Sequence, residues 1–285
     1  MGTSEVDIWR LYEMMLKSRR YEEAVKKLWD DGMISGEMHM GTGEEAIITA
    51  VVSQLKDGDA MALDHRGTAA MLMRGVDPVG LLLEFMGHPK GICTGYGGHM
   101  HLFSKDLLAA SSGIVGSAGP AACGFALAAQ YKKTDNLAVA FFGEGSTNQG
   151  MMLEAFNFTT ALNLPVLFVC KDNSWAITTQ SPEMTGGTLI DRANGFGMDA
   201  VDVDGTDPAA VWNVVNVAIG KIRSAGGPYF IQAKCEHKEG HFLGDPLLRF
   251  IKTPKQAFGQ VTGPLMRSMF AFKGSAFMKR MGSVG

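Results

Sequence analysis

The sequence predicts an α/β fold in which a doubly wound, mostly parallel sheet carries helices on both faces. Two apolar runs, 137–142 and 166–170, are short enough to be buried strands, and a segment with helical spacing, 148–163, separates them. Strands that are apolar along their whole length are typical of parallel sheets covered on both sides. Two such strands joined by a helix form a βαβ unit, and we expect the rest of the sheet to be built around it.

Composition restricts the class of protein. The chain has 285 residues, of which 46% are hydrophobic and 19% are charged, as expected for a folded chain with one large α/β domain. A formal net charge of −3 argues against a nucleic-acid partner. The four cysteines are widely spaced without a CxxC pair, which favours reduced thiols in a cytoplasmic protein over a zinc site. The first twenty residues contain acids and no apolar run, so we expect no signal peptide.

One uncharged stretch has to be weighed against a membrane span. Residues 107–129 carry no charged side chain over 23 positions, which is long enough to cross a bilayer. The stretch also holds five glycine or proline residues and three serines, and alanine supplies much of the remainder. Its hydrophobicity is therefore low, and we expect a buried glycine-rich turn that leads into a helix over 118–130.

Helical and extended patterns alternate along the rest of the chain. Apolar residues recur at helical spacing over 8–30 with charges between them, which predicts an amphipathic surface helix with residues 19–22 on its solvated face. Residues 181–197 are polar and irregular, and we expect a loop or a turn-rich segment there. The further elements that we expect are helices over 46–55, 79–86 and 208–224 and strands over 61–63, 198–203 and 228–234.

Oxygen-bearing side chains follow both strands of the central βαβ unit. Glu144 comes directly after the first strand, and Asp172 and Asn173 come after the second. In open α/β sheets, ligands bind beyond the carboxyl ends of the strands. Gly143 and Gly145 beside the glutamate leave room for a phosphate group to approach the backbone. A hard cation held by a carboxylate, an amide oxygen and a diphosphate would suit this arrangement.

The same residues resemble the signature of proteins that bind thiamine diphosphate. Residues 146–171, 26 positions, separate Gly143-Glu144-Gly145 from Asp172-Asn173; the signature has Gly-Asp-Gly and, at a similar distance, Asn-Asn. The short motifs between them resemble those of the alpha subunit of the decarboxylating component of 2-oxo acid dehydrogenase complexes, including its acetoin dehydrogenase branch. Those motifs are Asn148-Gln149-Gly150, Glu154-Ala155, Asn157 and Leu164-Pro165. Two residues depart from the signature. Glu144 replaces Asp and is one methylene longer, and Asp172 replaces the first Asn and adds a negative charge.

The resemblance implies a thiamine-diphosphate-binding fold that holds Mg²⁺ and the cofactor. Glu144, Asn173 and the backbone carbonyl of Trp175 correspond to the magnesium ligands. An Arg at a strand end donates paired hydrogen bonds to phosphate, although a surface salt bridge is the alternative for Arg66. Ile177 corresponds to the apolar residue that props the cofactor in its bent form, with simple core packing as the alternative. The residues expected to contact the cofactor are His65, Arg66, Gly113, Val115, Gly143, Gly145 and Ile177.

Three histidines correspond to catalytic or active-site positions of the family. His39 lies in the segment 36–46, where Glu44 takes the place of a glutamine, and His241 lies in a glycine-flanked loop that could act as a lid. His101 follows His99 at a spacing that would also allow metal ligation, but active-site hydrogen bonding or packing is the favoured interpretation.

Two further positions depart from the family. Thr68 stands where the family usually has another histidine, and Phe242 stands where some relatives carry a phosphorylated serine. The first departure removes a candidate acid–base group and indicates altered chemistry. The second argues against regulation by phosphorylation at this position, because phenylalanine has no hydroxyl group.

The end of the chain differs from what precedes it. No acid follows Asp245, whereas seven Lys and Arg residues are interleaved there with apolar side chains. We expect a cofactor-binding domain over 1–250 and a basic, apolar tail over 251–285. Such a tail could lie on a membrane surface, but packing on a partner subunit is the favoured interpretation.

The resemblance implies a function that needs a second subunit. The family decarboxylates a 2-oxo acid such as pyruvate, or cleaves acetoin, and passes the acyl or aldehyde unit to a lipoyl group or another carrier. A beta subunit supplies the glutamate that protonates the cofactor, so we expect a heterotetramer in which this chain alone is inactive. The alternatives are a specialised acyl or acetaldehyde transferase that acts on a carrier protein, and a scaffold subunit without cofactor. The sequence leaves open which substrate and which acceptor are used.

Overall fold

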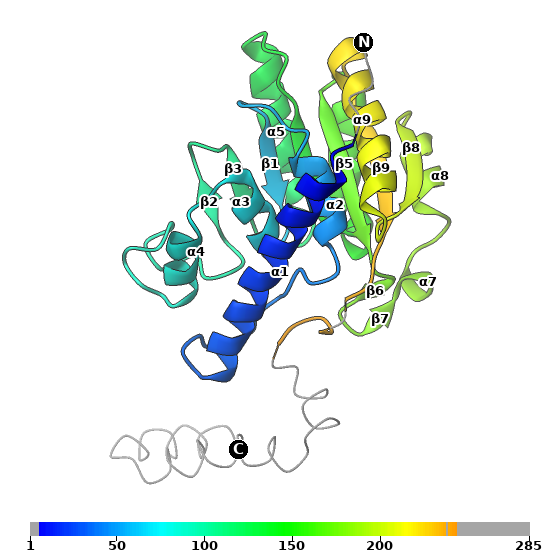
Figure 1. The fold of residues 1–285 in the computed structure, drawn as a ribbon. Helices are drawn as coiled ribbons and strands as arrows, with labels where there is room; N and C mark the ends of the chain where they lie inside the picture. The colour runs from blue at the N-terminus through cyan, green and yellow to red at the C-terminus, as the bar shows by residue number, and fades with distance from the viewer. Residues whose placement is uncertain (1–5, 238, 244–285) are drawn as a thin grey trace, which may run out of the picture. The chain divides into compact units, whose positions relative to one another are not determined.

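A computed structural model describes residues 6–237 and 239–243 of the chain (Figure 1). Residues 6–35 and 39–241, apart from 238, belong to one compact unit that contains every element named below. Residues 36–38 and 242–243 belong to a second unit, in which the Leu243 N–H donates to the Met38 carbonyl at 2.7 Å. The predicted tail over 251–285 lies outside the described residues.

Seven strands of the described chain form one mostly parallel sheet. Their order is β2-β3-β1-β4-β5-β9-β8, and only β2 runs antiparallel to its neighbour. The strands of this sheet are β2 (Phe103–Ser104), β3 (Ala109–Ser111), β1 (Ala60–Leu63), β4 (Ala138–Gly143), β5 (Val166–Asp172), β9 (Tyr229–Lys234) and β8 (Asp199–Asp204). A separate antiparallel pair consists of β6 (Trp175–Ala176) and β7 (Thr179–Gln180).

Helices cover both faces of the sheet (Figure 1). The α-helices are α1 (Ile8–Asp30), α2 (Glu45–Val52), α3 (Thr68–Arg74), α4 (Pro78–Phe85), α5 (Ala118–Tyr131), α6 (Gly150–Ala161), α7 (Ser181–Met184), α8 (Leu189–Gly195) and α9 (Pro208–Ala225), and a 3₁₀ helix, η1 (Glu144–Asn148), follows β4. Helices α2 and α9 pack together, and α9 contacts β5 and β9, whereas α5 and α6 pack against each other and α5 contacts β1 and β4. The predicted doubly wound α/β fold is confirmed.

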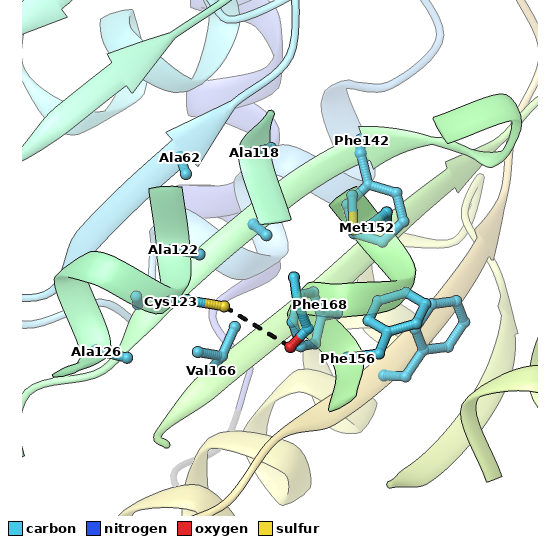
Figure 2. Packing of buried hydrophobic residues seen from close by; sticks show 14 of the residues in the cluster. Ala62, Ala118, Ala122, Cys123, Ala126, Phe142, Met152, Phe156, Val166 and Phe168 are labelled. Carbon is cyan, nitrogen blue, oxygen red and sulfur yellow. Dashed lines mark hydrogen bonds between the residues drawn. The ribbon is translucent and has the colours of Figure 1, made fainter. Parts of the chain in front are cut away.

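The core under α5 and α6 is built from every second residue of the central strands (Figure 2). Successive side chains of a strand point to opposite faces, so Ala138, Ala140 and Phe142 of β4 reach this core together. Phe156 of α6 packs edge-on against Phe168 of β5, with ring centroids 4.9 Å apart. Small residues on α5 let that helix lie close to the strands, and this packing holds the carboxyl ends of β4 and β5 in place.

Most predicted elements are confirmed, with ends that differ by a few residues. The helix predicted over 8–30 is α1, and the uncharged stretch 107–129 forms a strand, turns and α5 rather than a membrane helix. No helix of the described residues is long and apolar enough to cross a bilayer. The loop or turn-rich segment predicted over 181–197 instead contains the helices α7 and α8, and α3, β2, β3 and the pair β6–β7 were not predicted. These missed elements are short, so their periodicity was weak.

The prediction of a solvated face over residues 19–22 is wrong for Glu22. Its side chain is buried, and one carboxylate oxygen accepts a hydrogen bond from the Gly41 N–H at 3.0 Å. The other oxygen is buried without a hydrogen-bond partner in the described chain. Burial raises the pKa of Glu22 to about 8, in spite of the Gly41 hydrogen bond. The loop that precedes α2 therefore covers this part of α1.

We predict that the free energy of unfolding of Glu22→Gln falls less than that of the wild type as pH rises from about 5 to about 8. In the wild type, Glu22 keeps its proton in the folded chain up to about pH 8 but loses it in the unfolded chain near pH 4.5. Between these values the free energy of unfolding falls as pH rises, by up to about 1.4 kcal/mol per pH unit for this group. The glutamine variant lacks this loss, so its stability gain over wild type should grow from about pH 5 to about pH 8.

Urea unfolding across this pH range measures the effect. Glu23→Gln is the matched control, because Glu23 is exposed and pairs with Arg20 on the surface. A stability difference between Glu22→Gln and wild type that stays constant with pH would contradict the prediction.

Candidate functional site

The register of two neighbouring strands brings the predicted cation ligands together. Strands β4 and β5 pair in parallel from Ala138 with Val166 to Gly143 with Lys171. Glu144, the first residue of η1, therefore lies beside the end of β5. The Asn173 N–H approaches a Glu144 carboxylate oxygen at 3.4 Å.

Glu144 is a buried carboxylate that pairs with no cation of the described residues. Its oxygens receive hydrogen bonds from the Ser181 hydroxyl at 2.9 Å and from the Asn173 N–H. In the described part of the chain, no Lys, Arg or His nitrogen lies within 4 Å of it. Burial, with a smaller contribution from Asp172, raises the pKa of Glu144 to about 7. Glu144 also lines a cavity of about 710 Å³.

The donor set at this position fits a hard cation. The Asn173 side-chain oxygen accepts the Trp175 N–H at 3.1 Å, which leaves its second lone pair available and places it beside the Trp175 backbone. Glu144, Asn173 and the Trp175 carbonyl supply oxygen ligands only, as Mg²⁺ prefers. Bound Mg²⁺ would also neutralise the buried Glu144 carboxylate. These three residues could therefore hold Mg²⁺.

Asp172, the other departure from the signature, makes contacts of its own. One carboxylate oxygen accepts from the Gln232 side chain at 2.6 Å, and the other accepts from the Ser174 N–H at 2.9 Å. Each Asp172 carboxylate oxygen thus accepts a hydrogen bond from a residue other than Asn173.

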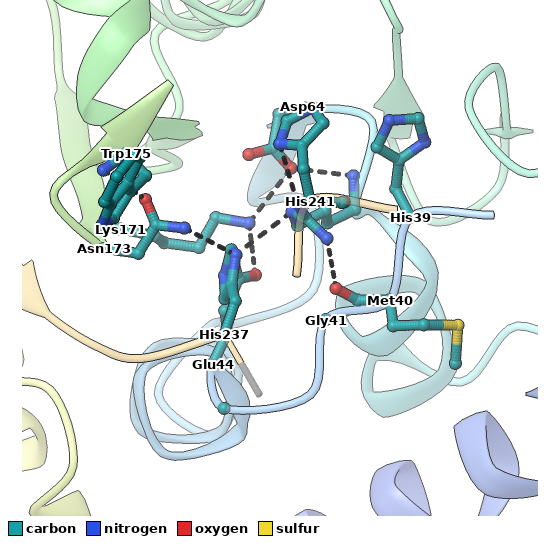
Figure 3. Close-up of polar contacts among 12 residues, drawn as sticks. His39, Met40, Gly41, Glu44, Asp64, Lys171, Asn173, Trp175, His237 and His241 are labelled. Atoms are coloured by element: carbon teal, nitrogen blue, oxygen red, sulfur yellow. Dashed lines mark hydrogen bonds and ion pairs between the residues drawn. The ribbon is translucent and has the colours of Figure 1, made fainter. Parts of the chain in front are cut away.

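A buried ion network lies next to these ligands (Figure 3). The Lys171 ammonium, at the end of β5, contacts Glu44 at 2.6 Å and Asp64 at 3.0 Å. The Arg66 guanidinium lies 4.0 Å from the same Glu44 carboxylate. Burial lowers the pKa of Lys171, but the two acids raise it above its ordinary value. Burial alone would raise the pKa of Glu44, yet Lys171 and its other partners hold it well below the usual range. Both groups are therefore ionised.

Arg66 ties two segments of the site together. Its guanidinium donates to the Met40 carbonyl and to the His241 carbonyl, the latter at 2.7 Å. The alternative of a surface salt bridge is wrong, since the side chain is buried. The predicted contact between Arg66 and a diphosphate remains a prediction.

Histidines from four segments gather around Arg66. The ring of His39 lies 4.6 Å from that of His65 and 5.1 Å from that of His241, between centroids. The His99 Nε2 is 2.9 Å from the His39 Nδ1. Burial lowers the pKa of His65 and His99 to about 4 and that of His39 further, and Arg66 lowers all three. These three rings are neutral near pH 7. The His65 Nε2 is buried with no hydrogen-bond partner in the described chain.

A transition metal is a poor occupant of the histidine cluster. Ring nitrogens of His39, His65 and His241 lie within 4.8 Å of one another, which is compact enough for shared ligation. However, the Arg66 guanidinium lies 3.4 Å from the His241 Nδ1. The field that disfavours a proton on these imidazoles disfavours a dication more strongly. The cluster is better suited to a neutral or anionic group.

The other predicted residues differ in exposure and in the space around them. His101 is exposed beside Gly113, where an added Cβ would lie 3.3 Å from the His101 Nε2. At Gly145 an added Cβ would lie 2.8 Å from the Ala176 Cβ, whereas at Gly143 it would meet no atom within 4 Å. Val115 is 49% exposed and Ile177 is 61% exposed, so the core-packing alternative for Ile177 is wrong. Ile177 also has φ +57°, an uncommon conformation for a β-branched residue.

The charged network around Lys171 was not predicted from the sequence. Lys171, Asp64 and His237 were given no role, and Glu44 was noted only as a replacement. One signal was present: a lysine that ends an otherwise apolar buried strand needs a buried acid as partner. The sequence could not indicate which acids supply the partnership, because Glu44 and Asp64 lie more than 100 positions away.

Comparison with known proteins identifies the family. The model of the dehydrogenase E1 component family matches residues 12–256. The alpha subunit of acetoin:2,6-dichlorophenolindophenol oxidoreductase from Bacillus subtilis (strain 168) is 38% identical over 245 residues, which cover 85% of this chain and 73% of that one. The pyruvate dehydrogenase E1 component subunit alpha from Zymomonas mobilis is 35% identical over 243 residues, which cover 84% and 69%.

Among solved structures, an enzyme from Mycobacterium smegmatis described as thiamin diphosphate-dependent aligns with a TM-score of 0.45. It is 20% identical and covers 69% of this chain and 33% of that one. The family match and the two sequence relatives confirm the resemblance drawn from the strand-end residues. The chain belongs to the dehydrogenase E1 component family.

Proposed function

We propose that this chain is the alpha subunit of a two-subunit, thiamine-diphosphate-dependent enzyme that decarboxylates a 2-oxo acid such as pyruvate or cleaves acetoin. The observation that carries the proposal is the meeting of Glu144 and Asn173 at neighbouring strand ends, beside the open position at Gly143. The relatives' names, which refer to acetoin and pyruvate, support the substrate class. The acyl or aldehyde unit passes to a lipoyl group or another carrier, and the enzyme works in the cytoplasm.

The strand ends bind the cofactor through its diphosphate and Mg²⁺. Glu144, the Asn173 amide oxygen and the Trp175 carbonyl hold the cation, and the backbone at Gly143 and Gly145 accommodates the diphosphate. When bound there, the cofactor would supply a nucleophilic carbon and a place for the electron pair of the broken carbon–carbon bond. Arg66 holds the segments of Met40 and His241 at fixed positions around this space.

The histidine cluster orients the substrate. Neutral imidazoles donate from one ring nitrogen and accept at the other, so His39 and His65 bind a carbonyl oxygen or hold a proton without adding charge. His241 lies against both rings and can exchange a proton with the same group. The backbone of Gly113 and Val115 would contact the aminopyrimidine of the cofactor, and the His101 ring lies beside Gly113. The positive charge of Arg66 favours a substrate carboxylate in this space.

A beta subunit covers the edge of the site. Ile114, Val115, Trp175 and Ile177 are apolar and between 46% and 62% exposed. Exposed apolar side chains around a ligand site are typical of surfaces that a partner covers. The beta subunit then completes the site in an alpha–beta heterotetramer.

We predict that Asn173→Ala abolishes magnesium-dependent binding of thiamine diphosphate. The variant loses one oxygen ligand, and affinity should fall by more than about 100-fold, since even outer partners of a metal contribute 10–100-fold. Calorimetry on the complex of this chain with its beta subunit measures the loss. Asn194→Ala, an exposed position on α8, is the control and should bind as wild type does. A wild-type complex that binds no cofactor at millimolar concentration would overturn the proposed function and favour the scaffold alternative.

We predict that activity requires both subunits. This chain alone should reduce no 2,6-dichlorophenolindophenol with pyruvate or acetoin, whereas the chain mixed with its beta subunit should reduce the dye with one of them. The physical reason is that a site with this much exposed apolar surface is incomplete. Dye reduction by the isolated chain at the rate of the complex would contradict the prediction. Comparing the two substrates also selects between decarboxylation and acetoin cleavage.

A further inference from the structure

The side-chain amide of Asn173 is held in one orientation by two different contacts (Figure 3). The Trp175 N–H is a donor and lies 3.1 Å from one amide atom, which must therefore be the oxygen. The amide nitrogen then lies on the other side, 2.7 Å from the His237 Nδ1. A reversed amide would place two N–H groups against each other at Trp175. The orientation thus follows from the donor chemistry, without further assumption.

This orientation determines which ring nitrogen of His237 carries a proton. The Asn173 amide nitrogen is a donor only, so the His237 Nδ1 accepts and carries no hydrogen. The His237 Nε2 lies 2.7 Å from a Glu44 carboxylate oxygen and donates its hydrogen to it. The other Glu44 oxygen accepts from the Lys171 ammonium at 2.6 Å. Lys171, Glu44, His237 and Asn173 form a line of hydrogen bonds, in which each bond fixes the direction of the next.

We propose that His237 is a positioning residue for the cation site: held by Glu44, it accepts the Asn173 amide hydrogen and keeps the Asn173 oxygen turned toward the Trp175 backbone. The proposal rests on the proposed function, in which the Asn173 oxygen is a magnesium ligand. Without the His237 acceptor, only the Trp175 N–H at 3.1 Å would oppose a turn of the amide, and a turned amide presents nitrogen, which is no ligand for Mg²⁺. Outer partners that orient a ligand in this way typically contribute 10–100-fold to metal affinity.

A purely structural role would use the same contacts for another purpose. The chain after β9 runs along the end of β5, where the Cys235 N–H donates to the Asp172 carbonyl at 2.8 Å. The bond from His237 to Glu44 could simply hold this segment. The two roles depend on different ring nitrogens: positioning needs the acceptor at Nδ1, and anchoring needs the donor at Nε2.

Two substitutions separate the ring nitrogens. In His237→Asn, the shorter amide places an oxygen near the former Nδ1 and loses the reach to Glu44. In His237→Gln, the longer amide places its nitrogen near the former Nε2, where it still donates to Glu44, and no acceptor faces Asn173. Positioning predicts that His237→Gln weakens cation binding about 10–100-fold while His237→Asn stays within about threefold of wild type. Anchoring predicts the reverse order.

The experiment measures Mn²⁺ binding by the complex of this chain with its beta subunit in the presence of thiamine diphosphate. The electron paramagnetic resonance signal of free Mn²⁺ gives the dissociation constant without any turnover. His88→Gln is the matched control, because His88 is an exposed histidine after α4 and should leave the affinity unchanged. The unfolding temperature of each complex shows whether a variant is assembled.

The stated order, Gln weak and Asn close to wild type, supports the proposal. Equal affinities for both variants, or the reverse order, overturn it while leaving the proposed function intact. If His237→Gln does not assemble, His237→Asn decides alone, since a tenfold loss there overturns positioning. A wild-type complex that retains no Mn²⁺ with the cofactor overturns the proposed function itself, and the inference with it.

Discussion

The buried Lys171 ammonium sets the electrostatic arrangement at the strand ends. A charge this deeply buried persists only when opposite charges surround it, because its desolvation costs several kcal/mol. Glu44 and Asp64 supply those charges from two other segments, and Arg66 adds a second cation beside Glu44. Two cations thus face two carboxylates, and removing any one of them would leave a buried charge unpaired at about 3–5 kcal/mol. The two loops that carry Glu44 and Asp64 are therefore fixed around the end of β5.

The network explains why two buried glutamates behave in opposite ways. Glu44 lies against Lys171, Arg66 and His237, so its pKa is low and it remains an anion. Glu144 is also buried but faces Asp172 and no cation in the described chain, so its pKa is raised. When the environments of two carboxylates push their pKa values apart, the two groups can serve different tasks. Glu44 is a fixed anion that already pairs with Lys171 and Arg66. Glu144 pairs with no cation of the described residues, and a bound cation would stabilise its ionised form.

The sequence predicted the central part of the site because that part follows from local rules. Parallel strands end at the same edge, so Glu144 and Asn173 had to meet once the βαβ unit was recognised. The network could not be predicted in this way, since its members come from segments far apart in the chain. Glu22 shows the same limit: the charges on α1 indicate a solvated face, but a loop around Gly41 covers it. Arg66 was predicted at the right place, while its contacts with two backbone carbonyls depend on tertiary packing alone.

The departures from the family signature can be judged by where their atoms lie. Asp172 turns its carboxylate to Gln232 and to the Ser174 N–H, so the added charge acts on the site only at a distance, by raising the pKa of Glu144. In the proposed site, Asn173 is then the residue whose side-chain amide would face the cation. Because Asp172 stands in place of the other asparagine, oxygen ligation by an amide would depend on the orientation of Asn173 alone. The longer Glu144 side chain is held at one oxygen by the Ser181 hydroxyl, which restricts the extra rotation that its additional methylene allows. Both departures are thus accompanied by side chains that limit their effect on oxygen ligation.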